Sequence, residues 1–355
     1  MTRMTCLARR IALTVGTVIV LVGCTPTAAG AHAIEGVDST NYRTRIDGIV
    51  PPHGGLEVEV VEAGSRLELE NRTDEEVIVY GYQAEPYLRI DAKGGVFQNR
   101  LSPATYINAD RQGSRQPPPD ADPSANPEWV RIDDGFVVRW HDHRAHWMGA
   151  RDAPAVRRAP SESHVVIPEW KVPLEIAGEE STVRGDLTWV PGPSPTPWYL
   201  LAVGLAALVV AAGLGRRSHL RLAGIVALLI GVDLAHIAAK AAAGAGGIGA
   251  GVGAILSGSF FSIAAWLVGG FAIRLLLRDS DDGPLAAAFT GAVIALLGGL
   301  ADIADLSRSQ LPVAVPDAIA RLFVTLSMGV GVGLVLAALL VLRRRPHPRP
   351  QPQAS

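Results

Sequence analysis

Cysteine and lysine are scarce in this chain of 355 residues. Its two cysteines, Cys6 and Cys24, both lie near the N-terminus, so the long polar region that follows has no internal disulfide. A soft metal ion bound in that region would need histidine, methionine or carboxylate ligands. Lysine occurs only as Lys93, Lys171 and Lys240. We attribute the bias toward arginine to a GC-rich genome rather than to function.

A strong net charge and nucleotide-binding motifs are also missing. The formal net charge is −2, which offers no strong field for binding nucleic acid. No Walker-type or kinase-type sequence is present, so an energised pump is not expected. The chain also lacks a Ser-His-Asp order and paired carboxylates in a recognisable frame. We therefore do not expect an enzyme, and copper oxidation chemistry is the one enzymatic alternative.

Apolar residues are abundant but unevenly distributed. They make up 48% of the chain, and the mean hydropathy of +0.25 indicates membrane segments. We expect an α+β membrane protein in which an extracytoplasmic β-sandwich precedes a bundle of about five transmembrane helices. Its expected parts are a leader over 1–31, the β-sandwich over 32–190, a proline-rich linker over 191–197, the helical domain over 198–342 and a disordered basic cytoplasmic tail over 343–355.

Five apolar segments are long enough to cross a lipid bilayer as helices. They cover residues 198–215, 219–238, 250–277, 285–304 and 318–342. Arginines cluster after the first and fifth of these segments, at 216–221 and 343–349, and at the end of the third, at 274–278. Because loops rich in Lys and Arg stay in the cytoplasm, this spacing predicts a β domain outside the cytoplasm and a C-terminus inside it.

The N-terminal region has the shape of a signal peptide, with arginines in residues 1–10 and an apolar run from Ile11 to Val22. The sequence offers three alternative cleavage sites. An L-V-G-C sequence resembles a bacterial lipobox and would lipidate Cys24. An A-G-A sequence would leave His32 as the first residue, and A-H-A would leave Ile34. An uncleaved anchor helix is a further alternative.

Short segments with alternating apolar and polar residues predict β-strands in the first half. We expect these strands at 56–61, 67–70, 77–82, 87–90, 136–140, 164–167 and 182–190. Strands of this number and spacing favour a β-sandwich of the immunoglobulin-like or cupredoxin-like kind. Residues 101–127, which include three consecutive prolines, interrupt the pattern and predict a long exposed loop.

The run W-H-D-H-R-A-H-W-M over residues 140–148 holds three of the nine histidines. On a strand, His141 and His143 would point to one face and could both reach a metal ion. His146 and Met148 could complete the site if the chain turns after Arg144. Imidazole suits copper and zinc, and a thioether suits Cu(I). Copper is therefore the expected cofactor, with zinc as an alternative.

The same run permits two other interpretations. Its histidines, aspartate, arginine and tryptophans can form a hydrogen-bonded network without a metal, or Arg144 can recognise a partner or an anionic ligand. Further along the chain, the ionisable residues near the predicted outer ends of the apolar segments include Asp233, His236, Asp302, Asp305 and Arg321. Ionisable groups at membrane depth usually face the interior of a helix bundle. They predict an ion or metal site, or else a structural pair of Arg321 with Asp302 or Asp305.

A mature N-terminal histidine combined with a later Trp-His-x-His sequence resembles the copper site in the cupredoxin-type subunit of particulate methane and ammonia monooxygenases. The resemblance implies that His32 chelates copper through its amine and ring, and that His141 and His143 complete the site. It covers these residues and the plan of a β-domain beside membrane helices. The segment from Arg144 to Met148 departs from it, and lipidation of Cys24 would remove the terminal histidine.

Several segments together resemble an uncharacterised family of actinobacterial membrane proteins. They are N-Y-R-T-R over 41–45, E-P-Y-L-R over 85–89, S-P-A-T-Y over 102–106 and the histidine run. The resemblance implies a location and an architecture, and is compatible with copper-handling partners. We expect a cell-membrane protein that binds copper in metal homeostasis or delivery. The alternative is a non-catalytic structural or interaction protein whose histidines form a hydrogen-bond network.

Overall fold

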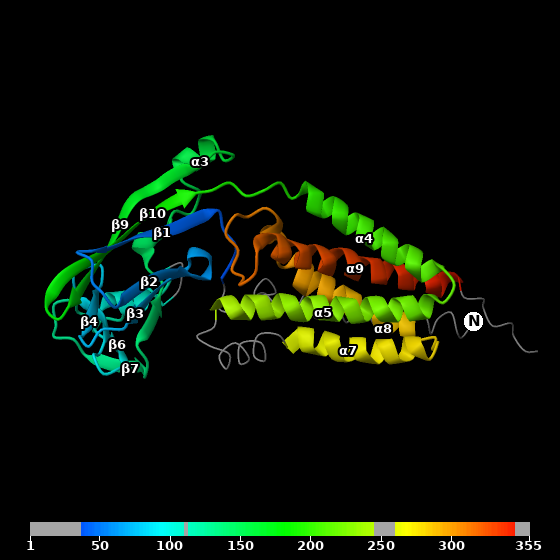
Figure 1. The fold of residues 1–355 in the computed structure, drawn as a ribbon, viewed down its shortest axis with the longest axis horizontal. Coiled ribbons are helices and arrows are strands. Elements are labelled where there is room, and N and C mark those ends of the chain that lie inside the picture. The colour runs from blue at the N-terminus through cyan, green and yellow to red at the C-terminus, as the bar shows by residue number, and fades with distance from the viewer. Residues whose placement is uncertain (1–36, 110–112, 245–259, 345–355) are drawn as a thin grey trace, which may run out of the picture. The chain divides into compact units, whose positions relative to one another are not determined.

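The computed structural model of the chain describes residues 37–109, 113–244 and 260–344, which fall into two compact units. The β unit comprises Val37–Pro193 together with Arg308–Pro312. The helical unit comprises Ser194–Ser307 and the described residues from Val313 onward. Figure 1 shows the strands of the first and the helices of the second. The predicted leader with Cys24, and the alternative first residues His32 and Ile34, lie outside the described residues.

The β unit contains two antiparallel sheets. The larger has the order β1-β10-β9-β4-β5-β6-β7, and the smaller has the order β2-β3-β8. The strands of the larger sheet are β1 (Tyr42–Val50), β4 (Val77–Tyr80), β5 (Pro86–Ile90), β6 (Val96–Asn99), β7 (Trp129–Asp133), β9 (His164–Ile176) and β10 (Glu179–Trp189). Those of the smaller are β2 (Leu56–Val61), β3 (Arg66–Asn71) and β8 (Val137–Trp140). The predicted β-rich region is confirmed, and its strands are antiparallel.

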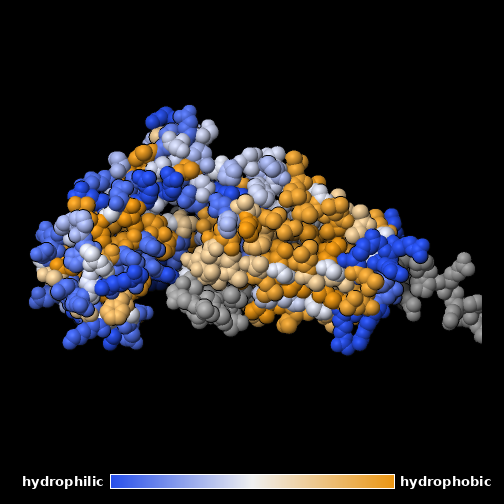
Figure 2. All heavy atoms as spheres, viewed as in Figure 1, coloured by the Kyte–Doolittle hydropathy of each residue, from blue (hydrophilic) through white to orange (hydrophobic). Residues whose placement is uncertain are grey.

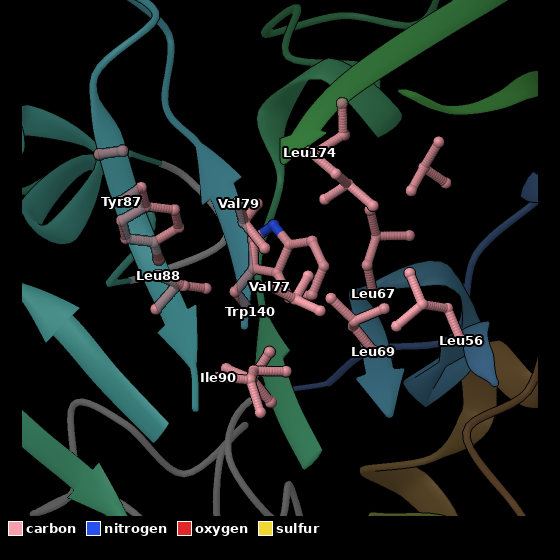
Figure 3. Packing of buried hydrophobic residues seen from close by; sticks show 14 of the residues in the cluster. Leu56, Leu67, Leu69, Val77, Val79, Tyr87, Leu88, Ile90, Trp140 and Leu174 are labelled. Atoms are coloured by element: carbon pink, nitrogen blue, oxygen red, sulfur yellow. The ribbon is translucent and has the colours of Figure 1, made fainter. Parts of the chain in front are cut away.

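Both sheets contribute to one hydrophobic core. In β3 the buried positions alternate with half-buried ones, because successive side chains of a strand point to opposite faces. Leu67 and Leu69 of β3 share the core with Val77 and Val79 of β4. Figure 3 shows the Trp140 ring lying among these side chains. Trp140, the first residue of the histidine run, is therefore a core residue. Its packing fixes the position from which the rest of the run starts.

Short helical elements connect the strands: η3 (Glu62–Gly64), α2 (Pro103–Ile107), η4 (His143–Ala145) and α3 (Pro154–Arg158). The prediction of an exposed loop over 101–127 is wrong for the start of this segment, which forms the helix α2. Ser102 caps α2 by accepting from the Ala104 amide, and a proline occupies the first turn, where its missing N–H costs nothing. Ala104 is fully buried, so this segment starts as part of the core.

Five helices of the described chain are long and apolar enough to cross a membrane, as judged by length and composition. They are α4 (Thr196–Leu214), α5 (Ser218–Gly244), α7 (Phe260–Leu277), α8 (Gly283–Ile294) with its continuation η5 (Ala295–Leu300), and α9 (Asp317–Arg344). A short helix, η6 (Ile303–Leu306), precedes α9. Figure 2 shows apolar side chains covering much of the visible helical surface. These features agree with the predicted multi-pass membrane protein.

Glycines allow the membrane helices to approach closely. α9 packs against α4, α5 and α8. A side chain at Gly329 would start 2.5 Å from the Ala202 carbonyl oxygen of α4. One at Gly331 would start 2.5 Å from the Gly291 carbonyl oxygen of α8. These backbones touch because no side chain separates them.

Arg308–Pro312, between η6 and α9, belongs to the β unit. Thr40 and Gln310 exchange backbone hydrogen bonds of 3.0 and 2.8 Å. The Ser309 amide donates to Asn41 Oδ1 at 2.9 Å, and its hydroxyl donates to the Val190 carbonyl at 2.7 Å. The β unit is thus built from two parts of the sequence that lie far apart.

Candidate functional site

The histidine run lies where β8 ends and η4 begins. β8 stops at Trp140, and Asp142 caps η4 by accepting from the Arg144 amide at 3.1 Å. The two-residue alternation of a strand therefore does not extend through His143. The geometry expected for a shared metal ion, with His141 and His143 on one face of a strand, is replaced by a turn.

His141 and His146 converge on one backbone oxygen, the carbonyl of Ser65. His141 Nδ1 lies 2.7 Å from it and His146 Nε2 lies 2.9 Å from it. Because a carbonyl oxygen only accepts, each of these ring nitrogens donates a proton. Arg66 Nε donates to His141 Nε2 at 3.3 Å. These partners assign His141 as the neutral tautomer with its proton on Nδ1.

A strained turn presents the Ser65 carbonyl to the two imidazoles. Glu62, Ala63 and Gly64 have φ angles of 54°, 53° and 91°, a region that residues with a Cβ rarely adopt. The Ser65 amide donates to the Glu62 carbonyl at 3.0 Å. Arg66 forms an ion pair with Glu62 at 3.4 Å. The histidines therefore hold a turn whose backbone conformation is costly.

Asp142 is the centre of a second set of contacts. It is fully buried and accepts from Trp140 Nε1 at 2.9 Å and from Arg144 Nε and Nη2, both at 2.8 Å. Arg144 also donates to the carbonyls of Tyr80 and Gly81 and lies over the Tyr82 ring. Burial lowers the pKa of Arg144, but the hydrogen bonds and charge of Asp142 outweigh it, so the pKa stays above its ordinary value.

His143 and Met148 lie apart from the Ser65 contact. The His143 ring stacks on Tyr82 with centroids 6.2 Å apart, and its backbone amide donates to the Tyr82 hydroxyl at 3.0 Å. The Tyr82 hydroxyl donates to Asn108, and burial raises the pKa of Tyr82. Met148 is 44% exposed. The structure thus separates His143 and Met148 from the pair of histidines, His141 and His146, that share the Ser65 carbonyl.

Within the described ranges, no group of three His, Cys, Asp or Glu side chains is arranged to hold a metal ion. The lone pair of His141 Nε2, which a metal would need, points at the Arg66 guanidinium. The predicted completing ligand His32 lies outside those ranges. Copper or zinc binding by His141, His143, His146, His32 and Met148 stays a prediction.

The helical unit contains a polar cluster that includes the predicted membrane residues. Lys240 Nζ donates to Asp302 Oδ1 at 2.6 Å, and His236 Nε2 lies 3.5 Å from Asp302 Oδ2. Asp233, His236 and Lys240 lie at positions i, i+3 and i+7 of α5 and so share one face. This face carries the polar groups that α5 presents to its neighbours.

Arg321 has two described partners near the start of α9. Its Nε donates to the Asp305 backbone carbonyl at 3.1 Å, and its Nη2 lies 3.2 Å from Asp317 Oδ2. Lys240 is the cation paired with Asp302. A pair of Arg321 with the Asp302 or Asp305 carboxylate stays a prediction, and Asp317 is a partner that the sequence analysis did not name.

Asp233 is the most deeply buried acid of the cluster, with 0% of its surface exposed. Trp266 Nε1 of α7 donates to its Oδ2 at 2.8 Å, and the Ser262 hydroxyl also hydrogen-bonds to its carboxyl group. Ser262 and Trp266 are four residues apart and lie on one face of α7. A buried acid held by two side chains of a neighbouring helix is a candidate site for ion or proton binding.

Several residues of both clusters carry no signal in the sequence. Ser65 and Arg66 lie 76 and 75 residues before His141, and Trp266 lies 33 residues after Asp233. A serine and an arginine between two predicted strands resemble any polar turn. A tryptophan in an apolar segment resembles an interfacial anchor. The fold alone brings these side chains to the histidines and to Asp233.

Comparisons with protein-family models, with curated proteins and with solved structures find no match to this chain.

Proposed function

We propose that this protein is a non-catalytic, membrane-anchored structural or interaction protein of the cell envelope. In this proposal the β unit is a sandwich held outside the cytoplasm, and the C-terminus lies inside. The arginines that follow α4, α7 and α9 support this orientation. The helices anchor the β unit in the lipid bilayer, and partner proteins meet it outside. The histidine run braces this unit and carries no chemistry of its own.

One observation carries the proposal, namely the shared acceptor of the two buried histidines. A metal site needs ring nitrogens with available lone pairs. Instead, His141 and His146 donate to the Ser65 carbonyl, and Arg66 brings a positive charge to the remaining nitrogen of His141. A cation at that position repels a metal ion. The arrangement supports a network that fixes the turn before β3 against η4.

Substitutions that mimic one ring nitrogen test this role. Asparagine places an amide donor near the position of Nδ1, and glutamine places one near Nε2. H141N and H146Q should therefore retain most of the stability of the β unit. H141A and H146A should each lose about 1–3 kcal/mol, the usual cost of leaving a buried group unpaired. Urea unfolding of the purified full-length protein measures the difference, with H53A as the control.

Metal content measured on the same proteins tests the copper alternative. The unaltered protein and all four variants are loaded with Cu(I), Cu(II) or Zn(II) and dialysed. The network predicts no stoichiometric metal in any of them. About one equivalent of copper in the unaltered protein, lost in H141N and H146Q as well as in the alanine variants, would contradict the network and support the metal-binding function.

A further inference from the structure

We propose that Asp233 is a reversible proton-binding site inside the helical unit, and that its proton exchanges through His236 and the Asp302–Lys240 pair. The proposal does not depend on the function proposed for the β unit. It rests on the packing of Asp233, on the charges around it, and on the row of ionisable groups along α5.

The two carboxyl oxygens of Asp233 have different surroundings. Oδ2 accepts from Trp266 Nε1 at 2.8 Å. Among the described residues, Oδ1 has no hydrogen-bond partner, and neither does Ser327 Oγ of α9. Asp233 Oδ1 and Ser327 Oγ both face Gly298, because a Cβ there would lie 2.5 Å from the first and 3.4 Å from the second. Ser327, like Asp233, has 0% of its surface exposed.

The backbone at Gly298 departs from a regular α-helix. Gly298 lies in η5, a π-helical turn that continues α8. Such turns are rare and occur frequently at functional sites. Glycine leaves room there for the carboxyl oxygen, which occupies the place of a side chain. The irregular turn and the missing side chain together create the space that Asp233 Oδ1 fills.

The charged groups around Asp233 leave its charge unbalanced. Lys240 of α5 pairs with Asp302, as does His236 when it is protonated, and Arg321 of α9 pairs with Asp317. Asp305 of η6 adds a further acid. The neighbouring α4, α7, α8 and η5 add no charged side chain except Arg274, in the last turn of α7. Residues 245–259 contain no ionisable side chain at all.

A fully buried carboxylate without a counter-charge is costly, and a bound proton removes the charge. The protonated Oδ1 becomes a donor, and Ser327 Oγ is the acceptor that faces the same space. A metal cation would need more oxygen ligands than these two side chains supply, whereas a proton needs one donor and one acceptor. The site therefore fits a proton.

The exchange route follows one face of α5. His236 lies one turn after Asp233, and His236 Nε2 is 3.5 Å from Asp302 Oδ2. In this route the His236 ring takes up the proton that Asp233 releases and passes a proton on to the Asp302 carboxylate. Asp302 and Lys240 have side chains that are 12% and 10% exposed, so this end of the row is the more accessible one.

Infrared spectroscopy of the full-length protein in lipid vesicles tests proton binding directly. The C=O stretch of a protonated carboxyl group should be present in the unaltered protein and lost in D233N. Asparagine has the shape of a protonated aspartic acid, so D233N should fold. S327A should shift the band, because it removes the acceptor. D282N, at an exposed acid that precedes α8, should leave the band unchanged.

Transfer of the vesicles into D₂O tests the route. The band moves when deuterium replaces the proton, and its rate of movement should fall in H236Q. H219Q alters another histidine of the same helix and should leave the rate unchanged. The proposal is overturned if D233N and the unaltered protein show the same protonated-carboxyl bands at every pH at which the protein is folded. It is also overturned if sodium shifts the Asp233 signal, or if H236Q exchanges as fast as H219Q.

Discussion

Tyr80 links the stability of the β unit to alkaline pH at the scale of a single residue. Its hydroxyl donates to Glu175 Oε2 at 2.5 Å across the pair of strands β4 and β9. Burial, followed by the hydrogen bond and charge of Glu175, raises the pKa of Tyr80 from 10.0 to about 12. The native state therefore holds this proton more tightly than the unfolded state does.

The sign of the effect follows from this raised pKa. The stabilisation is fully present below pH 10 and is lost as the pH rises toward 12, because the unfolded state then releases the proton first. We expect the urea midpoint of the full-length protein to fall between these pH values, and Y80F to flatten that fall. Y106F, at a tyrosine that donates to the Arg100 carbonyl, is the control. An unchanged slope in Y80F would contradict the assignment to Tyr80.

At the same scale, the sequence identified residues better than it identified their partners. The clustering of His141, His143 and His146 is visible in the sequence, and so is the shared face of Asp233 and His236. Their interpretation depended on Ser65 and Ser327, which no local pattern marks. Residues so far apart in the chain are brought together by strand register and helix packing, which form only in the folded protein.

At the scale of elements, Gly331 of α9 shows how closely the helices pack. A Cβ there would lie 2.5 Å from the Gly291 carbonyl oxygen and 2.8 Å from the Ala295 Cβ. We expect G331A to separate the two helices and to cost about 1–3 kcal/mol, the usual range for overpacking. Thermal unfolding of the purified full-length protein in detergent measures the loss.

Gly224 of α5 provides the matched control, because a Cβ there meets no atom within 4 Å. G224A should be neutral or should stabilise the helix by up to about 1 kcal/mol, since alanine has the higher helix propensity. Equal losses in G331A and G224A would show that the effect comes from the helix backbone and not from the contact between α8 and α9.

Strand β9 shows why the lengths of elements were harder to predict than their presence. The expected strand covered 164–167, whereas β9 extends over His164–Ile176 and includes Pro168 and Pro173. Proline normally argues against a central strand, because it has no N–H to donate to a neighbouring strand. β4 pairs only with Leu174, Glu175 and Ile176. Both prolines therefore lie where β9 has the single neighbour β10, a fact that depends on sheet order.

At the scale of the whole molecule, hydropathy and membrane length fix the number of spanning helices, because about 20 apolar residues are needed to cross a bilayer. The same reasoning missed the contribution of Arg308–Pro312 to the β unit. Its hydrogen bonds with Asn41 and Val190 join residues 268 and 119 positions apart. Composition cannot reveal such a pairing, since the segment resembles any polar connection between two helices.

The orientation of the chain is the remaining prediction at this scale. Arg274 in the last turn of α7 and Arg278 after it predict that the connection to α8 is cytoplasmic. Three spans, α4, α5 and α7, separate the β unit from this connection, so the β unit is then outside. N126C places a thiol on an exposed part of the β unit, and D281C places one between α7 and α8. A membrane-impermeant maleimide applied to intact cells should label N126C alone.

Labelling of the parent chain sets the background, because it contains only Cys6 and Cys24. Permeabilised cells provide the second control, in which both introduced cysteines should react. If D281C reacts in intact cells and N126C does not, the orientation is the reverse. The β unit would then lie in the cytoplasm, where an extracytoplasmic docking role is excluded. The proton site at Asp233 would be unaffected, because its contacts lie entirely within the helical unit.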